Sequence, residues 1–198
     1  MLFRVLLLLV VAAGSAPAAA SDAQGRFAPK GAGQVTCEQF LQALEARKEN
    51  AILAVGWMEG FLTAMNQGLP NTFDIAPWQN SEALIGLVKH NCEQNKDQRF
   101  LAVVASLIDF LKDQRLEEAS EMIVAESGEK KVAIYKAVMK NVQEKLIAKG
   151  MLEGGADGQF GPKTKTALEA FQTEQKIEVT GLPDQQTLWR LLGNPQSG

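Results

Sequence analysis

Histidine and cysteine are scarce in this sequence: 198 residues contain one histidine and two cysteines. A zinc site built from several histidines is therefore excluded, and neither a His-Glu-x-x-His nor a Gly-x-Ser-x-Gly run occurs. The lone histidine, His90, is more simply explained as a surface or capping residue than as a chemical one. We expect no metal and no cofactor.

A concentrated basic patch is also missing. Lysine and arginine total 20 against 23 aspartates and glutamates, which gives a net charge of −3, and the lysines are interspersed with glutamates. Binding to a phosphate backbone requires clustered positive charge. Nucleic acid is therefore not expected as a partner.

Long apolar runs are limited to residues 5–13, which follow Arg4. A membrane span needs about 20 apolar residues. A basic residue, a short apolar run and the small residues Ala18, Ala19 and Ala20 are typical of a cleaved signal peptide, here 1–20. No cysteine to which a lipid could be attached lies near the cleavage site. We expect an exported chain with no membrane anchor after cleavage, whose net charge becomes −4 because only Arg4 is lost.

Export changes the interpretation of Cys37 and Cys92. In an oxidising compartment, an even number of cysteines in a compact domain favours a disulfide. Such a bond restricts the unfolded chain by about 4 kcal/mol on the loop-entropy estimate. A redox pair is more often Cys-x-x-Cys, and a metal site needs more ligands. We predict a structural disulfide.

The cysteines lie in a predicted helical domain over 35–113, preceded by a flexible lead over 21–34. Thr36 and Gln39 have capping-box spacing at the start of a first helix. A second helix ends at Gly68 and Pro70, and Asn80 or Ser81 caps a third one that runs towards Cys92. Apolar residues recur at helical spacing in the second helix and in a fourth, namely Ala51, Val55, Met58, Leu62 and Met65, then Phe100, Val104, Leu107 and Leu111.

Residues 114–138 are predicted to be a helical connector. A Glu-rich helix over 116–124 is interrupted at Ser127 and Gly128, and a long helix from about Lys130 continues into the next domain. We expect no internal repeat.

The C-terminal part, 139–193, is predicted to contain three helices, followed by a tail over 194–198. Asp157 and Gly158 form a turn pair. Gly161 and Pro162 have the positions of a helix N-cap and first residue, and Asp184 caps the last helix. The predicted fold class of the whole chain is therefore all-α, with a disulfide-stapled N-terminal bundle and a C-terminal three-helix bundle.

These C-terminal residues carry a family resemblance. The segments 146–150 (Leu-x-x-x-Gly), 157–164 (Asp-Gly-x-Phe-Gly-x-x-Thr) and 187–191, with the pairs Phe171-Gln172 and Thr180-Gly181, resemble the peptidoglycan-binding domain of bacterial cell-wall proteins. The resemblance implies a shallow groove beside the 157–161 turn and a periplasmic location. It implies that peptidoglycan is contacted by six residues, Asp157, Gln159, Phe160, Thr164, Gln172 and Thr180. Each of them also has a structural explanation as a turn, cap or core residue.

A second resemblance covers the cysteine-containing domain. The segment 35–37 with Phe40 and Leu41, the segment 60–62 with Asn66, and Cys92 followed by Asn95 and 100–111 resemble exported helical domains of the HdeA and Tai-immunity type. Relatives of that type act as acid-stress chaperones or as inhibitors of wall amidases. The resemblance implies that these roles are open to this chain.

We therefore expect a non-enzymatic periplasmic protein that binds peptidoglycan, whose N-terminal domain is structural or binds another envelope protein. One alternative is an inhibitor, an immunity protein or an acid-stress chaperone whose clients meet Trp57, Phe61 and Trp78 as an exposed patch. The other is a carboxylate-dependent murein hydrolase, for which Glu59 is the candidate acid because it lies among apolar neighbours.

Overall fold

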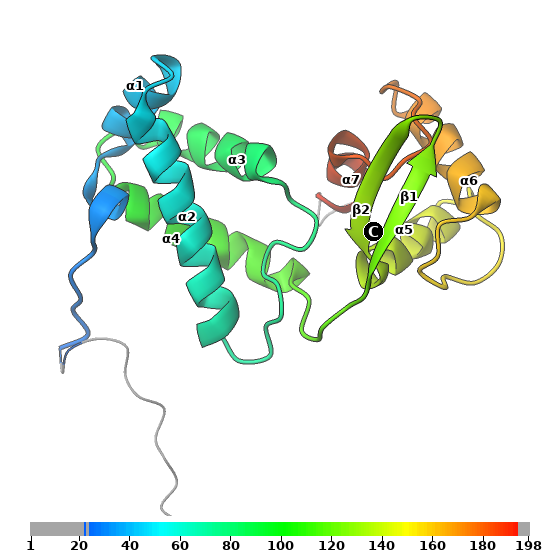
Figure 1. The fold of residues 1–198 in the computed structure, drawn as a ribbon, viewed down its shortest axis with the longest axis horizontal. Coiled ribbons are helices and arrows are strands. Elements are labelled where there is room, and N and C mark those ends of the chain that lie inside the picture. Colours follow the sequence, from blue (N-terminus) through cyan, green and yellow to red (C-terminus); the bar gives the residue numbers. More distant parts are fainter. Residues whose placement is uncertain (1–21, 23, 194–198) are drawn as a thin grey trace, which may run out of the picture. The chain divides into compact units, whose positions relative to one another are not determined.

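The computed structural model describes residue 22 and residues 24–193 (Figure 1). The predicted signal peptide, 1–20, and the predicted tail, 194–198, lie outside the described residues. Residues from Gly31 onward cluster into one compact unit. We call 31–114 the N-terminal lobe and 122–193 the C-terminal lobe.

The N-terminal lobe is helical, as predicted. It contains a 3-10 helix η1 (Gly31–Gln34), the helices α1 (Cys37–Glu45), α2 (Glu49–Gly68), α3 (Ser81–Gln94) and α4 (Phe100–Leu111), and a 3-10 turn η2 (Lys112–Gln114).

Local hydrogen bonds fix where these helices begin. Thr36 caps α1 in the predicted capping box: its Oγ1 accepts from Gln39 N at 3.2 Å, and Gln39 Oε1 accepts from Thr36 N at 3.0 Å. Asn80 caps α3, because its Oδ1 accepts from Ala83 N at 2.9 Å. The second helix, α2, ends at Gly68, before Pro70. These boundaries confirm the sequence predictions.

The core of the N-terminal lobe is formed by α1 to α4. Phe40 and Phe100 pack with ring centroids 4.7 Å apart. The lobe buries Cys37, Phe40, Ala54, Met58, Leu62, Ile75, Leu84, Val88, Cys92, Phe100, Val103, Val104, Leu107, Ile108 and Leu111. The end of the predicted flexible lead also contributes to this core, because η1 packs against it. The contact is close, since a Cβ added at Gly33 would lie 2.4 Å from Cζ2 of Trp57. The four residues of η1 are thus ordered by Trp57.

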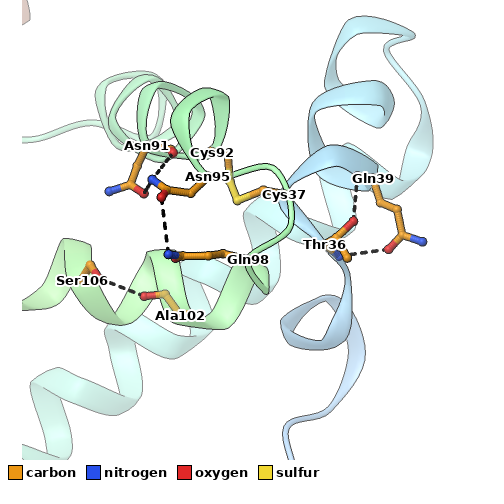
Figure 2. The surroundings of a disulfide bond; sticks show 9 residues. All are labelled: Thr36, Cys37, Gln39, Asn91, Cys92, Asn95, Gln98, Ala102 and Ser106. Atoms are coloured by element: carbon orange, nitrogen blue, oxygen red, sulfur yellow. Dashed lines mark hydrogen bonds between the residues drawn. A yellow bond between two sulfur atoms is a disulfide. The ribbon is translucent and has the colours of Figure 1, made fainter.

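The predicted disulfide is present and joins Cys37, the first residue of α1, to Cys92, in the last turn of α3 (Figure 2). Both residues are fully buried. The connection after α3 is held at the same place, since Cys37 N donates to Gln98 O at 2.8 Å and Asn95 Nδ2 donates to Asn91 O at 2.9 Å. The disulfide therefore joins two helices at the point where the chain turns into α4.

The predicted helical connector is wrong. In its place the structure has an antiparallel hairpin of β1 (Met122–Ser127) and β2 (Lys130–Tyr135), in which Ile123 pairs with Ile134 and Ser127 with Lys130 (Figure 1). All-α is therefore only an approximate description. Alternating β-branched residues favour strands, and the break predicted at Gly128 is the first residue of a two-residue hairpin turn, where its φ of 60° suits glycine.

The C-terminal lobe combines the hairpin with α5 (Lys136–Ala148), α6 (Pro162–Glu174) and α7 (Gln185–Leu192). Contacts join α5 to β2, α6 and α7, so α5 is its central helix. Its core is Ala125, Ile134, Val138, Met139, Val142, Leu146, Leu152, Ala167, Leu168, Phe171, Leu182, Leu188 and Leu191, to which Trp78 and Leu116 are added from preceding segments. The predicted caps are confirmed: Pro162 opens α6 after Gly161, and Asp184 Oδ1 accepts from Thr187 N at 2.9 Å.

The loop between α2 and α3 is hydrogen-bonded to the segment that connects the two lobes, 115–121. Its Phe73 N donates to Leu116 O at 2.7 Å, and Leu116 N donates to Asp74 O at 2.8 Å. Trp78 from the same loop is 8% exposed. Among the described residues, no helix combines the length and apolar character that crossing a bilayer requires.

Replacing both cysteines, Cys37→Ser with Cys92→Ser, should lower the free energy of unfolding by about 2–4 kcal/mol, because the open chain gains conformational freedom when unfolded. Urea unfolding followed by circular dichroism measures this loss. Reducing agent should bring the native chain to the midpoint of the double variant and leave the variant unchanged. An identical midpoint for oxidised native chain and variant would contradict the prediction.

Candidate functional site

The two loops that connect the helices of the C-terminal lobe carry most of the residues predicted to bind a ligand. The first, 149–161, joins α5 to α6, and the second, 175–184, joins α6 to α7. Each loop is held by the side-chain amide of a buried glutamine on the helix that precedes it.

Gln143 of α5 holds the first loop. Its Nε2 lies within hydrogen-bond distance of Asp157 Oδ1 (3.0 Å), Gln159 O (2.9 Å) and Thr164 Oγ1 (3.1 Å), while its Oε1 accepts from Gly158 N at 2.7 Å. Gly158 has a φ of 73°, and a Cβ there would lie 2.7 Å from the carbonyl oxygen of Lys136, so only glycine fits. The side chain of Gln143 thus fixes the predicted Asp157-Gly158 turn. The sequence alone did not predict this role of Gln143.

Gln172 of α6 holds the second loop in the same way. Its Nε2 lies 3.0 Å from Thr180 Oγ1, 3.0 Å from Leu182 O and 2.8 Å from Thr187 Oγ1, and its Oε1 accepts from Gly181 N at 2.8 Å. Its side chain is completely buried. Every polar atom of Gln172 is therefore used within the chain.

The two arrangements repeat one another, although no internal repeat was expected. Thr164 and Thr187 are each the third residue of their helix. In the sequence, Gly158 and Gly181 each stand six residues before that threonine. The Gly-x-x-x-x-x-Thr spacing is the signal that reveals the relation in the sequence.

The six predicted contact residues differ in their exposure to solvent. Thr164 and Gln172 are buried and bonded within the chain. Thr180 is half-buried and donates from Oγ1 to Asp184 Oδ2 at 2.6 Å. Asp157 and Gln159 are exposed and Phe160 is half-buried against the core.

Asp157 is an ionised acceptor in this turn. Its Oδ1 accepts from Gln159 N at 2.8 Å. This backbone hydrogen bond, followed by the one from Gln143, lowers the pKa of the Asp157 carboxyl below its ordinary value. The carboxylate therefore orients the loop from which the Gln159 side chain projects.

A surface groove of about 440 Å³ runs between β2 and the second loop, and Thr180 lines it. The acidic residue Glu178 at this rim is not an unpaired negative charge, because Lys130 Nζ of β2 lies 2.6 Å from Glu178 Oε1. The same contact raises the pKa of the Lys130 ammonium above its ordinary value. The hairpin thereby neutralises one acid of the rim.

The side chains considered for catalysis lie apart in the N-terminal lobe. Glu59 Oε1 accepts from Ser81 Oγ at 2.5 Å, and both side chains are exposed. His90 is exposed on α3. Within the described part of the chain, no three or more His, Cys, Asp or Glu side chains gather as a metal site would require.

The three aromatic residues expected in an exposed patch do not form one. Trp57 and Phe61 stack at 5.2 Å and are half-buried on the N-terminal core, whereas Trp78 is buried in the other core. The exposed apolar side chains of α2 are instead Ile52 and Leu53, 73% and 66% exposed. Leu53 borders a groove of about 490 Å³ that also contacts Val35, Phe40 and Ala54.

The fold thus defines a class of protein: a disulfide-stapled helical domain followed by a small helical domain with glutamine-pinned loops. The HdeA/HdeB family model matches residues 3–102, which are 100 of the 198 residues, and a model described as a putative peptidoglycan binding domain matches residues 136–191. The chain belongs to the HdeA/HdeB family, and its C-terminal helices α5 to α7 correspond to the second match. No curated protein and no solved structure matches the chain.

Gln172→Leu should lower the free energy of unfolding by about 1–3 kcal/mol or more, because it removes the hydrogen-bond partner of the buried Gly181 N–H and of the Leu182 carbonyl and one hydrogen bond of each of two threonine hydroxyls. Thermal unfolding measures the loss. Gln186→Leu, at an exposed position of α7, is the matched control and should change stability little. Equal stability of both variants would show that the buried amide is dispensable.

Proposed function

We propose that this chain is an exported, non-enzymatic protein of the periplasm that binds peptidoglycan through the domain over 136–191. The observation that carries the proposal is the match of that segment to a putative peptidoglycan binding domain. Two further observations support it: the motif residues make a rigid loop, and that loop presents side chains to solvent.

The exposed Asp157 and Gln159 and the half-buried Phe160 are the contacts we propose on the first loop. Their backbone is held by Gln143, so little conformational entropy is lost when a ligand binds. Thr164 and Gln172, which the resemblance implies as contacts, act in this proposal as the support of the loops. Thr180 remains a proposed contact through the groove beside β2.

Weak binding at one site suffices for such a function. Peptidoglycan is a repeating polymer that offers many sites at high local concentration, so a released chain rebinds nearby. The N-terminal lobe, stapled by its disulfide, would then be retained in the cell wall. We propose that it serves as a structural or protein-binding module there.

Sedimentation with purified sacculi tests the proposal, using the chain from Ser21 to Gly198, which keeps every described residue. The native chain should sediment with sacculi. Gln159→Ala should weaken binding about 2- to 10-fold, the loss expected for one hydrogen bond of about 0.5–1.5 kcal/mol. Gln94→Ala, at an exposed position of α3, is the control and should bind like the native chain.

Two results of this assay would contradict the proposal. If the native chain stays in the supernatant, the wall-binding function is wrong. If soluble muropeptides accumulate in the supernatant, the chain is a hydrolase, and Glu59→Gln then tests the one acid considered for that reaction.

A second candidate function is chaperone-like binding of unfolded polypeptides by the N-terminal lobe. Two observations favour it: membership of the HdeA/HdeB family, and the exposed side chains of Ile52 and Leu53, of which Leu53 borders a groove. Exposed apolar side chains next to a groove are a means of holding apolar segments of another chain.

Ile52→Ser with Leu53→Ser should at least halve the ability of the chain to suppress aggregation of an acid-denatured client, because the apolar contact area is lost. Light scattering at neutral and low pH measures the suppression. Phe110→Ser, at a 42% exposed position of α4, is the matched control and should leave it unchanged. Aggregation that the native chain does not slow at either pH would exclude this second function.

A further inference from the structure

A cavity of about 380 Å³ lies within the compact unit, beside the core that contains Trp78. Its volume falls in the range of about 300–1,000 Å³ that is usual for small-ligand sites. Three segments line it: the end of the α2–α3 loop, the hairpin, and the start of α7. The residues are Pro77, Trp78, Gln79, Asn80, Met122, Lys131, Val132, Ala133, Ile134, Pro183, Asp184, Gln185 and Leu188.

Two glutamines of this lining have buried amide nitrogens without a hydrogen-bond partner, Gln79 and Gln185. The side chain of Gln79 is more than nine-tenths buried, at 7% exposure. Leaving such a donor unsatisfied costs about 1–3 kcal/mol, so few are found in native proteins. Both glutamines are among the residues that line one cavity, and a ligand bound there would be one source of the missing acceptor.

The orientation of both amides follows from their oxygens. Asn80 N donates to Gln185 Oε1 at 2.8 Å, and Trp78 N donates to Gln79 Oε1 at 3.4 Å. A backbone N–H must face an acceptor, so the amide atom that it contacts is the oxygen. The other terminal atom of each amide is therefore the nitrogen of the NH₂ group. Both glutamines therefore offer donors, in contrast to Gln143 and Gln172, whose donors are fully used within the chain.

The charged side chains of the lining are already engaged. Lys131 Nζ lies 2.7 Å from Glu126 Oε1. Asp184 accepts from Thr187 at Oδ1 and from Thr180 at Oδ2. Apart from Asn80 and the two glutamines, the remaining lining residues, including Trp78, Met122 and Leu188, are apolar. Such a site favours an uncharged acceptor that carries apolar atoms rather than a free carboxylate.

We propose that this cavity binds a secondary amide through its carbonyl oxygen, with Gln79 and Gln185 as the donors and the apolar walls around its methyl or methylene groups. In peptidoglycan that chemistry occurs in the N-acetyl groups of the sugars and in the peptide bonds of the stem. The inference rests on the proposed wall-binding function and deepens it. It adds a site formed partly by Gln79 and Lys131, which lie outside the matched segment 136–191.

The experiment titrates the chain from Ser21 to Gly198 with two probes, an N-acetylglucosamine tetramer and a neutral stem tripeptide with blocked ends. NMR follows the side-chain NH₂ signals of Gln79 and Gln185, and calorimetry gives the affinity. One probe should shift both NH₂ signals, which identifies the sugar or the peptide as the source of the amide.

Gln79→Met supplies the variant test. It replaces the unsatisfied donor by an apolar group of similar length, so stability should be kept or raised while the affinity for the active probe falls at least five-fold. Gln94→Met, at an exposed position on α3, is the matched control and should bind like the native chain. The NMR titration of the native chain gives an answer even where a variant does not fold.

Three results would overturn the inference: neither probe shifts the two NH₂ signals, the signals shift but Gln79→Met binds as tightly as the native chain, or both probes fail to bind. Unshifted signals would mean that buried water satisfies the donors. The sedimentation assay separates this failure from that of the proposed function, since a chain that still sediments with sacculi binds the wall at another surface.

Discussion

The C-terminal lobe depends on one kind of interaction, the side-chain amide of a buried glutamine that satisfies a loop backbone. Burying an N–H or hydroxyl without a hydrogen-bond partner lowers the stability of the fold. Loops lack the regular backbone hydrogen bonds of helices and sheets, so other groups must supply these partners. Gln143 and Gln172 solve this problem twice, each with one acceptor and one donor group aimed at the following loop. The loop backbones are therefore held to the helices that precede them.

In the N-terminal lobe a covalent bond, the disulfide, holds two separate segments together. The disulfide holds the start of α1 against the end of α3 (Figure 2). The backbone hydrogen bond from Cys37 N to Gln98 O holds the connection that leads into α4. The aromatic residues Trp57 and Phe61 complete this core and hold η1 in place. The exposed apolar side chains Ile52 and Leu53 lie outside this core, near the start of α2.

Glutamines whose amide oxygen and nitrogen are both hydrogen-bonded differ in role from those whose amide nitrogen has no partner. The amide groups of Gln143 and Gln172 are hydrogen-bonded to the loops that follow them, so both side chains support the fold. Gln79 and Gln185 are anchored by their oxygens and keep a donor group without a partner. The same side chain thus serves as a support in one place and as a candidate recognition group in another.

Much of the helical architecture follows from local sequence. The capping box at Thr36, the caps at Asn80 and Asp184 and the turn at Asp157 are short-range interactions, and the disulfide was predicted from two cysteines in a chain that was expected to be exported. The sequence missed the hairpin, because residues 122–135 were assigned a helical pattern although their β-branched residues pair across a glycine turn. The family resemblance implied Gln172 and Thr164 as ligand contacts, and the structure shows that both side chains also form hydrogen bonds within the chain.

The sequence by itself determined the caps, the turns, the cysteine pair and the two family resemblances, because each rests on residues close in the chain or on a fixed motif. The tertiary structure decided which polar side chains are consumed in the fold and which remain for a ligand. Burial and hydrogen-bond satisfaction depend on neighbours from distant segments, as Gln79 and Gln185 show on the wall of one cavity. No spacing along the chain encodes that juxtaposition.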